Sequence, residues 1–117
     1  GFHDRIILGG YQISYDDASL LDSHYPSVDV FISGYAEDSL FQAIMAPASA
    51  LQKIYSDTPN FQHLPSPYSS GVIPVVAGQK MIRTETRRGC PYRCTFCAHR
   101  DLTQNKVYQI AIERKVS

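Results

Sequence analysis

Two short apolar runs, each followed by glycine, predict strands in the first half of the chain. One occupies residues 4–8 and leads into Gly9 and Gly10, and the other occupies residues 28–32 and leads into Gly34. Continuous apolar runs are typical of strands that a parallel sheet buries on both faces. The glycines serve either the turn alone or the close approach of the backbone to a ligand.

Each predicted strand is followed by a predicted helix. After a loop at residues 11–15, Asp16 and Asp17 can cap a helix that runs to about Tyr25. A second helix is predicted to begin near Ala36, because the two acidic residues that follow suit the positive end of a helix dipole. Its apolar residues recur at helical spacing: Leu40, Phe41, Ile44 and Met45.

Pro47 is predicted to begin a further helical stretch, with Leu51, Ile54 and Tyr55 on one face. The alternation of strand, glycine turn and helix is typical of a doubly wound α/β sheet, in which ligands bind outside the carboxyl ends of the strands. Because two strands cannot form such a sheet alone, we expect earlier strands outside this chain. The chain is thus expected to be a piece of a larger protein.

The pattern changes at residues 57–74, which are rich in proline and serine and lack periodicity. Such a composition predicts an extended linker, with a domain boundary near residue 60. Residues 81–86 alternate apolar and polar positions and are predicted to form a strand. Residues 101–105 are expected to form a polar turn, and residues 107–116 a mostly helical segment.

All three cysteines of the chain lie in one short segment, as Cys90, Cys94 and Cys97 in the spacing C-x3-C-x2-C. Thiolates favour iron–sulfur clusters or zinc. A four-iron cluster usually takes four thiolates, so three would leave one iron open for another ligand. The alternative is a structural zinc site, with His99 as the fourth ligand after the three thiolates.

This segment resembles the cluster loop of radical S-adenosylmethionine enzymes, whose signature is CxxxCx(aromatic)C. The three cysteines and Phe96 fill its defined positions, and the typical neighbours Arg88, Gly89 and Pro91 are present. The resemblance implies a four-iron, four-sulfur cluster whose open iron chelates S-adenosylmethionine, with Phe96 near the adenine or simply packed in the loop. It also implies reductive cleavage of the cosubstrate to a 5′-deoxyadenosyl radical, with an external electron donor. Arg87, Arg88 and Arg93 would place positive charge near the cluster or lie in solvent.

Residues 6–14 and 28–40 resemble the second half of the cobalamin-binding domain that precedes many of these enzymes. In that domain a Gly-Gly turn lies by the nucleotide tail of the cofactor, which implies this role for Gly9 and Gly10. Gly34 and Glu37 match a later GxGE-like turn, although the two residues between them depart from it. The DxHxxG motif that supplies a lower ligand to cobalt is absent from the chain, and neither His3 nor His24 has surroundings that replace it.

The expected fold class is α/β, and the chain divides into three parts. Residues 1–58 would form the C-terminal half of a Rossmann-like, doubly wound cobalamin-binding-type domain. Residues 59–79 would form the linker, and residues 80–117 the first βα portion of a radical S-adenosylmethionine partial (β/α) barrel. In that barrel, the cluster loop would emerge from the carboxyl end of the strand at residues 81–86.

Charge differs between the two halves of the chain, although the formal net charge is zero. Residues 1–79 carry two basic and eight acidic side chains, and residues 80–117 carry nine basic and three acidic ones. The basic residues are scattered, which favours an anionic cofactor site or docking between the halves over nucleic-acid binding.

An odd number of closely spaced cysteines argues against a secreted disulfide framework, and no apolar run is long enough to span a bilayer, so a cytoplasmic setting is expected.

The sequence supports two function hypotheses. The first is a radical S-adenosylmethionine enzyme, with the cobalamin-dependent methyltransferases as one candidate type, acting on a small-molecule or peptide substrate that these residues do not identify. This chain alone is expected to be inactive, because most of the barrel that encloses the radical lies outside it. The second is a non-enzymatic module that binds zinc or an electron-transfer cluster.

Overall fold

The structure, a computed structural model, describes residues 5–97 and 106–110. The chain divides into two compact units, Gly1–Pro59 and Asn60–Ser117. The division lies beside the boundary expected near residue 60. His3, His99 and the predicted turn at residues 101–105 lie outside the described residues.

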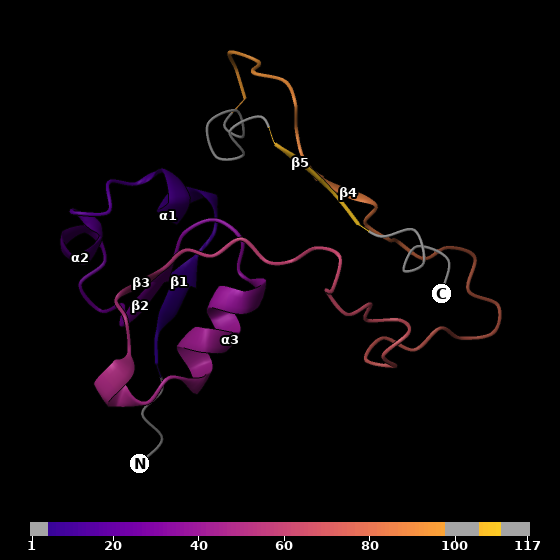
Figure 1. Ribbon diagram of the computed structural model, residues 1–117, viewed down its shortest axis with the longest axis horizontal. Helices are drawn as coiled ribbons and strands as arrows, with labels where there is room; N and C mark the ends of the chain where they lie inside the picture. Colours follow the sequence, from indigo (N-terminus) through magenta and orange to yellow (C-terminus); the bar gives the residue numbers. More distant parts are fainter. Residues whose placement is uncertain (1–4, 98–105, 111–117) are drawn as a thin grey trace. The chain divides into compact units, whose positions relative to one another are not determined.

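A parallel sheet of three short strands organises unit 1, in the order β1-β2-β3 (Figure 1). The strands are β1 (Ile7–Gly9), β2 (Val30–Ile32) and β3 (Ile54–Tyr55). Ile7 pairs with Val30, and Phe31 pairs with Ile54. The predicted α/β class is therefore confirmed as a small α/β fold. The second predicted strand contains β2, and the first overlaps β1 at Ile7 and Leu8.

Side chains alternate along β2, so the sheet has a core on each face. Phe31 is buried with Ile13 and Leu21, under the short helices α1 (Tyr11–Tyr15) and α2 (Leu21–His24). Val30 is buried on the opposite face with Ala43 and Tyr55, under α3 (Glu37–Met45). Figure 1 shows α3 on the other side of the sheet from α1 and α2.

The first helical segment differs from its prediction. Residues 11–15, predicted as a loop, form α1, because Gly10 turns the chain at a φ of 105° and Ile13 gains a buried position against Phe31. The helix predicted from Asp16 to about Tyr25 is only the single turn α2. Asp16 and Asp17 lie in the connection instead, where Asp17 accepts hydrogen bonds from Ser19.

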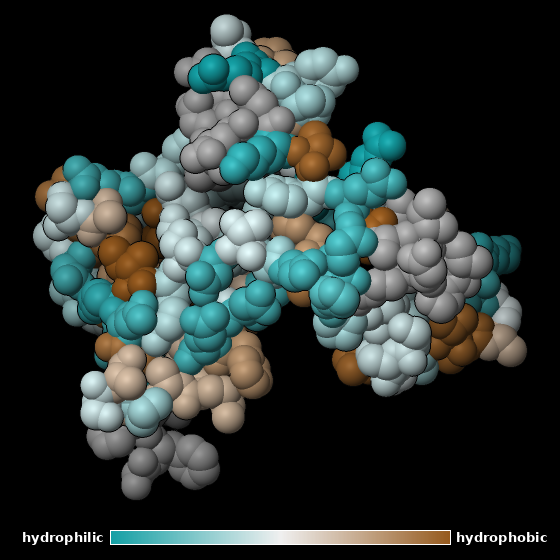
Figure 2. All heavy atoms as spheres, viewed as in Figure 1, coloured by the Kyte–Doolittle hydropathy of each residue, from teal (hydrophilic) through white to brown (hydrophobic). Residues whose placement is uncertain are grey.

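Helix α3 is confirmed close to its predicted start, but it packs through its small residues. Ser39 and Ala43 are buried against the sheet, whereas the large apolar residues are exposed, with Phe41 at 65%. Figure 2 shows apolar side chains at the surface in the region of α3.

The third predicted helix is wrong over most of its length. Pro47 precedes only a 3-10 turn, Ala48–Ala50, and residues 54–55 then form β3. Pairing of Tyr55 with Ile32 extends the sheet, and the buried Tyr55 ring joins the core beside Val30. This burial outweighs the helical spacing of the apolar residues.

Unit 2 contains an antiparallel ribbon of two strands, β4 (Arg87–Gly89) and β5 (Val107–Gln109) (Figure 1). Two predictions are corrected here. Residues 81–86 form no regular strand: among the described residues they belong to no sheet, and Met81 and Ile82 are exposed. Residues 107–109 are a strand rather than part of a helix, because they pair with β4. The remainder of that predicted helix, 111–116, lies outside the described residues.

The described residues 60–86 have little regular structure. Local turns are closed by backbone hydrogen bonds, such as Ser70 N to Ser66 O at 3.0 Å. Phe61, near the start of the predicted linker, is nevertheless buried. In the part of the chain that the structure describes, no helix has both the length and the apolar character to cross a membrane.

Candidate metal centre

Residues 90–106, here called the cysteine loop, connect the two strands of the ribbon and hold the three cysteines, and the structure describes residues 90–97 and 106 of this connection. Strand β4 ends at Gly89, directly before Cys90, and β5 begins directly after Lys106. Gly89 pairs with Val107 across the base. Gly89 has a φ of 98°, and an added Cβ there would collide with the carbonyl oxygen of Lys106, so only glycine fits this position.

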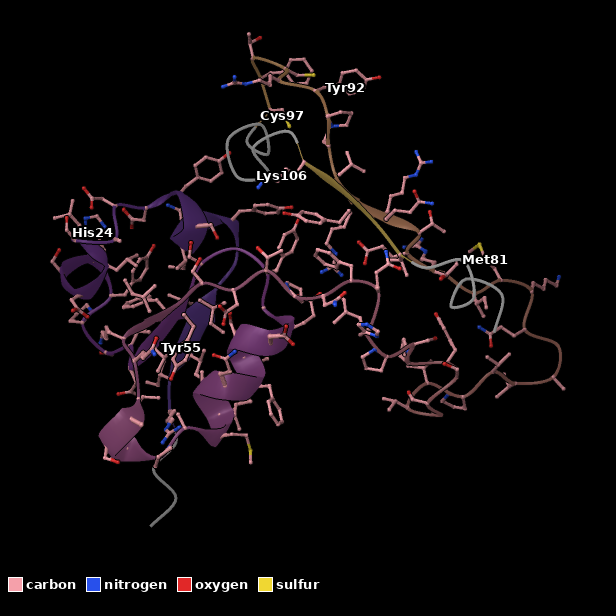
Figure 3. All side chains as sticks on the ribbon, viewed as in Figure 1. His24, Tyr55, Met81, Tyr92, Cys97 and Lys106 are labelled. Atoms are coloured by element: carbon pink, nitrogen blue, oxygen red, sulfur yellow. The ribbon has the colours of Figure 1, made fainter. Side chains whose placement is uncertain are left out.

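The three cysteines of this loop differ in their exposure to solvent. Cys94 is exposed, and Cys90 and Cys97 are half-buried. The amide of Cys97 donates a 3.0 Å hydrogen bond to the carbonyl oxygen of Cys94, which closes a turn between these two cysteines. Figure 3 shows Tyr92 and Cys97 on the part of the loop that projects beyond the ribbon.

The three cysteines are chemically suited to bind a metal centre through their thiolates. Three soft sulfur ligands lie within one short segment, as iron–sulfur clusters and zinc prefer. Among the described residues, no group of three His, Cys, Asp or Glu side chains lies close enough together to hold a metal ion. Because all three thiols belong to the same loop, it could gather them by local movement around a metal, while the ribbon keeps its ends together.

Phe96 lies between two cysteines and is 91% exposed. Its ring takes no part in a core, so ordinary loop packing does not account for it in this structure. An exposed ring beside the thiols is available to contact a planar ligand group.

The arginines beside the loop differ in their surroundings. Arg88 donates to both carboxylate oxygens of Glu85, from Nε at 2.9 Å and from Nη2 at 2.6 Å. This hydrogen bonding lowers the pKa of Glu85 below its ordinary value, against the opposing effect of its partial burial. Arg88 is thus paired with Glu85, and Arg87 and Arg93 are exposed.

The predicted ligand-binding glycines lie at the carboxyl ends of β1 and β2. Gly10 and Gly34 have φ values of 105° and 82°, and an added Cβ on either would meet nothing within 4 Å. Gly9 differs, since its Cβ would lie 3.3 Å from the carbonyl oxygen of Ile32 and thus press on the neighbouring strand. Gly10 and Gly34 therefore offer open backbone to a ligand, and Gly9 serves close strand packing.

Ser14 connects these two glycine turns, and sequence reasoning missed it. Its hydroxyl donates to the carbonyl oxygen of Gly10 at 3.0 Å and accepts from the amide of Gly34 at 2.8 Å. A serine four residues after a glycine turn gives no distinctive signal in the sequence. Glu37 is the first residue of α3, near the Gly34 turn.

His24, in α2, has a structural partner. Its Nδ1 lies 2.8 Å from Oδ2 of Asp16, which joins the end of α2 to the connection that precedes it.

Comparisons with protein-family models, with curated proteins and with solved structures found no match for this chain.

Proposed function

We propose that this chain carries the cluster loop of a radical S-adenosylmethionine enzyme. The observation that supports this most is the loop itself, which holds all three cysteines between two paired strands. Cys90, Cys94 and Cys97 would bind a four-iron, four-sulfur cluster through three irons and leave the fourth iron for S-adenosylmethionine. When bound, the cluster would supply the electron for reductive cleavage of the cosubstrate.

The chain's own residues would prepare this site. The ribbon would hold the two ends of the loop together, and the turn between Cys94 and Cys97 would keep two ligands adjacent. Phe96 would lie against the adenine of the cosubstrate. Arg87 and Arg93 would offset the negative charge of a thiolate-bound cluster.

We also propose a cobalamin contact at the carboxyl edge of the sheet in unit 1, at Gly10 and Gly34. Their open surroundings support this role, whereas Gly9 is better explained by packing. Absorbance titration with hydroxocobalamin tests it. A Gly34→Val substitution should weaken binding, and Gly71→Val is a matched control, since Gly71 also has a positive φ and open space. Equal binding by both variants would remove Gly34 from the proposal.

The alternative is a non-enzymatic zinc- or cluster-binding module, because the turn that joins Cys94 to Cys97 also suits a zinc site. Anaerobic reconstitution with iron and sulfide, with zinc offered in parallel, distinguishes a cluster from a zinc site, and a change of the reduced cluster's electron paramagnetic resonance signal on addition of S-adenosylmethionine distinguishes the enzyme from an electron-transfer cluster. The enzyme proposal predicts a brown protein with about four irons per chain, by analogy with cysteine-bound cubanes. Cys94→Ala should abolish the colour. A colourless protein that retains one zinc would refute the proposal.

A further inference from the structure

Phe61 is the most buried aromatic residue of unit 2, with only 4% of its surface exposed. Most large apolar residues of the described part of this unit are exposed, among them Val72, Val75 and Met81. Phe61 follows the proline-rich junction, where the sequence predicts an unstructured linker. Within unit 2, Phe61 has a specific partner.

That partner is the ribbon below the cysteine loop. The Phe61 ring lies 4.7 Å from the Tyr108 ring, measured between centroids, at an interplanar angle of 47°. The guanidinium of Arg88 lies 5.0 Å from the centroid of the Phe61 ring, in cation–π geometry. Arg88 and Tyr108 pair across the ribbon, one on each strand, so a single ring contacts both strands.

A neighbouring hydrogen bond and an ion pair reinforce this contact. Gln62 donates from Nε2 to the carbonyl oxygen of Gln109 at 2.7 Å, which attaches the backbone of β5 to the same segment. The Arg88 guanidinium also donates two hydrogen bonds to the Glu85 carboxylate. Phe61 and Gln62 thus both contact the ribbon, Phe61 through its ring and Gln62 through its side-chain amide.

The ribbon needs such support, because two strands of three residues each are at best marginally stable in water. If β4 and β5 separate, the ends of the cysteine loop separate with them. Cys90 directly follows β4, so the backbone of the first candidate ligand would then be less restricted, and ordering it around a metal would cost more conformational entropy.

We propose that Phe61, Arg88 and Tyr108 form an aromatic clamp that positions the cysteine loop for its metal. Phe61 is a positioning residue in this proposal, since it acts through its contacts with Arg88 and Tyr108 of the ribbon. The part of the proposal that concerns metal retention depends on the function proposed above. The part that concerns the ribbon does not.

The test compares Phe61→Ala with two other variants in the full chain. Phe61→Tyr keeps the ring and should behave as the unsubstituted protein. Met81→Ala removes an apolar side chain of the same unit that is exposed, and should also have no effect. Amide hydrogen exchange of residues 87–89 and 107–109 reports on the ribbon, and transfer of iron from the reconstituted cluster to a chelator reports on the site.

The clamp predicts that Phe61→Ala accelerates both exchange and iron transfer by about tenfold or more, which corresponds to about 1.4 kcal/mol. Circular dichroism and exchange of unit 1 amides would show that the rest of the chain still folds. Unchanged ribbon exchange in Phe61→Ala would overturn the clamp. Faster ribbon exchange with unchanged iron transfer would overturn its role in positioning the loop. If the unsubstituted protein binds no iron, the proposed function fails and the positioning role with it, while the exchange data still decide whether the clamp supports the ribbon.

Discussion

Gly89 lies directly against the carbonyl oxygen of Lys106, at the point where the two strands of the ribbon meet the cysteine loop. The contact leaves no space for a side chain on Gly89. It also sets the distance between the two ends of the loop that carries all three cysteines. The geometry of the base of the loop thus depends on one glycine that directly precedes the first candidate ligand.

Gly89→Ala should open the base of the loop. Alanine would meet both an unfavourable positive φ, which costs about 1–2 kcal/mol in left-handed backbone, and a collision with Lys106. Gly78→Ala is the matched control, because Gly78 has a similar φ of 87° but open space around it. Amide exchange of residues 107–109 measures the result. Equal acceleration in both variants would mean that backbone strain, and not the contact with Lys106, accounts for the effect.

Glu85→Gln should weaken the ribbon at neutral pH but have no effect in strong acid. The folded-state pKa of Glu85 lies below its ordinary value of 4.5, so its ionised form stabilises the folded state above that pH. This contribution is lost as the pH falls through the lowered pKa. It should be small, about 0–1 kcal/mol, because the pair is partly exposed to solvent.

An NMR titration of the Arg88 Nε–H resonance provides a direct measurement for this pair. The resonance should shift with an apparent pKa below 4.5 in the unsubstituted protein and should not titrate in Glu85→Gln. A midpoint at or above 4.5 would contradict the hydrogen-bonded pair.

Phe31→Ala should unfold unit 1, whereas Phe41→Ala should leave it folded. Phe31 is fully buried and joins the core under α1 and α2, so its loss should cost about 3–5 kcal/mol. That is a large part of the stability of a small domain. Phe41 is 65% exposed on α3, and its loss should change stability by about 0.5 kcal/mol or less. Thermal denaturation followed by circular dichroism compares the two, and similar midpoints would contradict the described core.

The sequence predicted the elements of unit 1 whose local pattern and burial agree. Val30, Phe31 and Ile32 form a continuous apolar run, and all three are buried in the central strand. The acidic start of α3 was also a reliable signal. Tyr55 shows where the pattern failed, because its helical spacing with Leu51 was outweighed by pairing with β2, a contact that the local sequence does not encode.

Unit 2 was less predictable because its structure depends on pairing between distant residues. Strand β5 pairs with β4 across the whole cysteine loop, and no periodicity marks either strand. Phe61 contacts Tyr108, far along the chain, and so lay unrecognised in a segment with the composition of a linker. The candidate ligands, in contrast, could be chosen from the sequence, because three cysteines in one short segment need no tertiary structure to be recognised.

The most direct test of the central proposal is the electron paramagnetic resonance spectrum of the reconstituted, reduced protein, recorded with and without S-adenosylmethionine. Three cysteine ligands leave one iron open, so the cosubstrate should bind that iron and change the signal. The same experiment with a Cys97→Ala variant should give no cluster signal at all. A cluster whose spectrum is identical with and without S-adenosylmethionine would contradict the proposal.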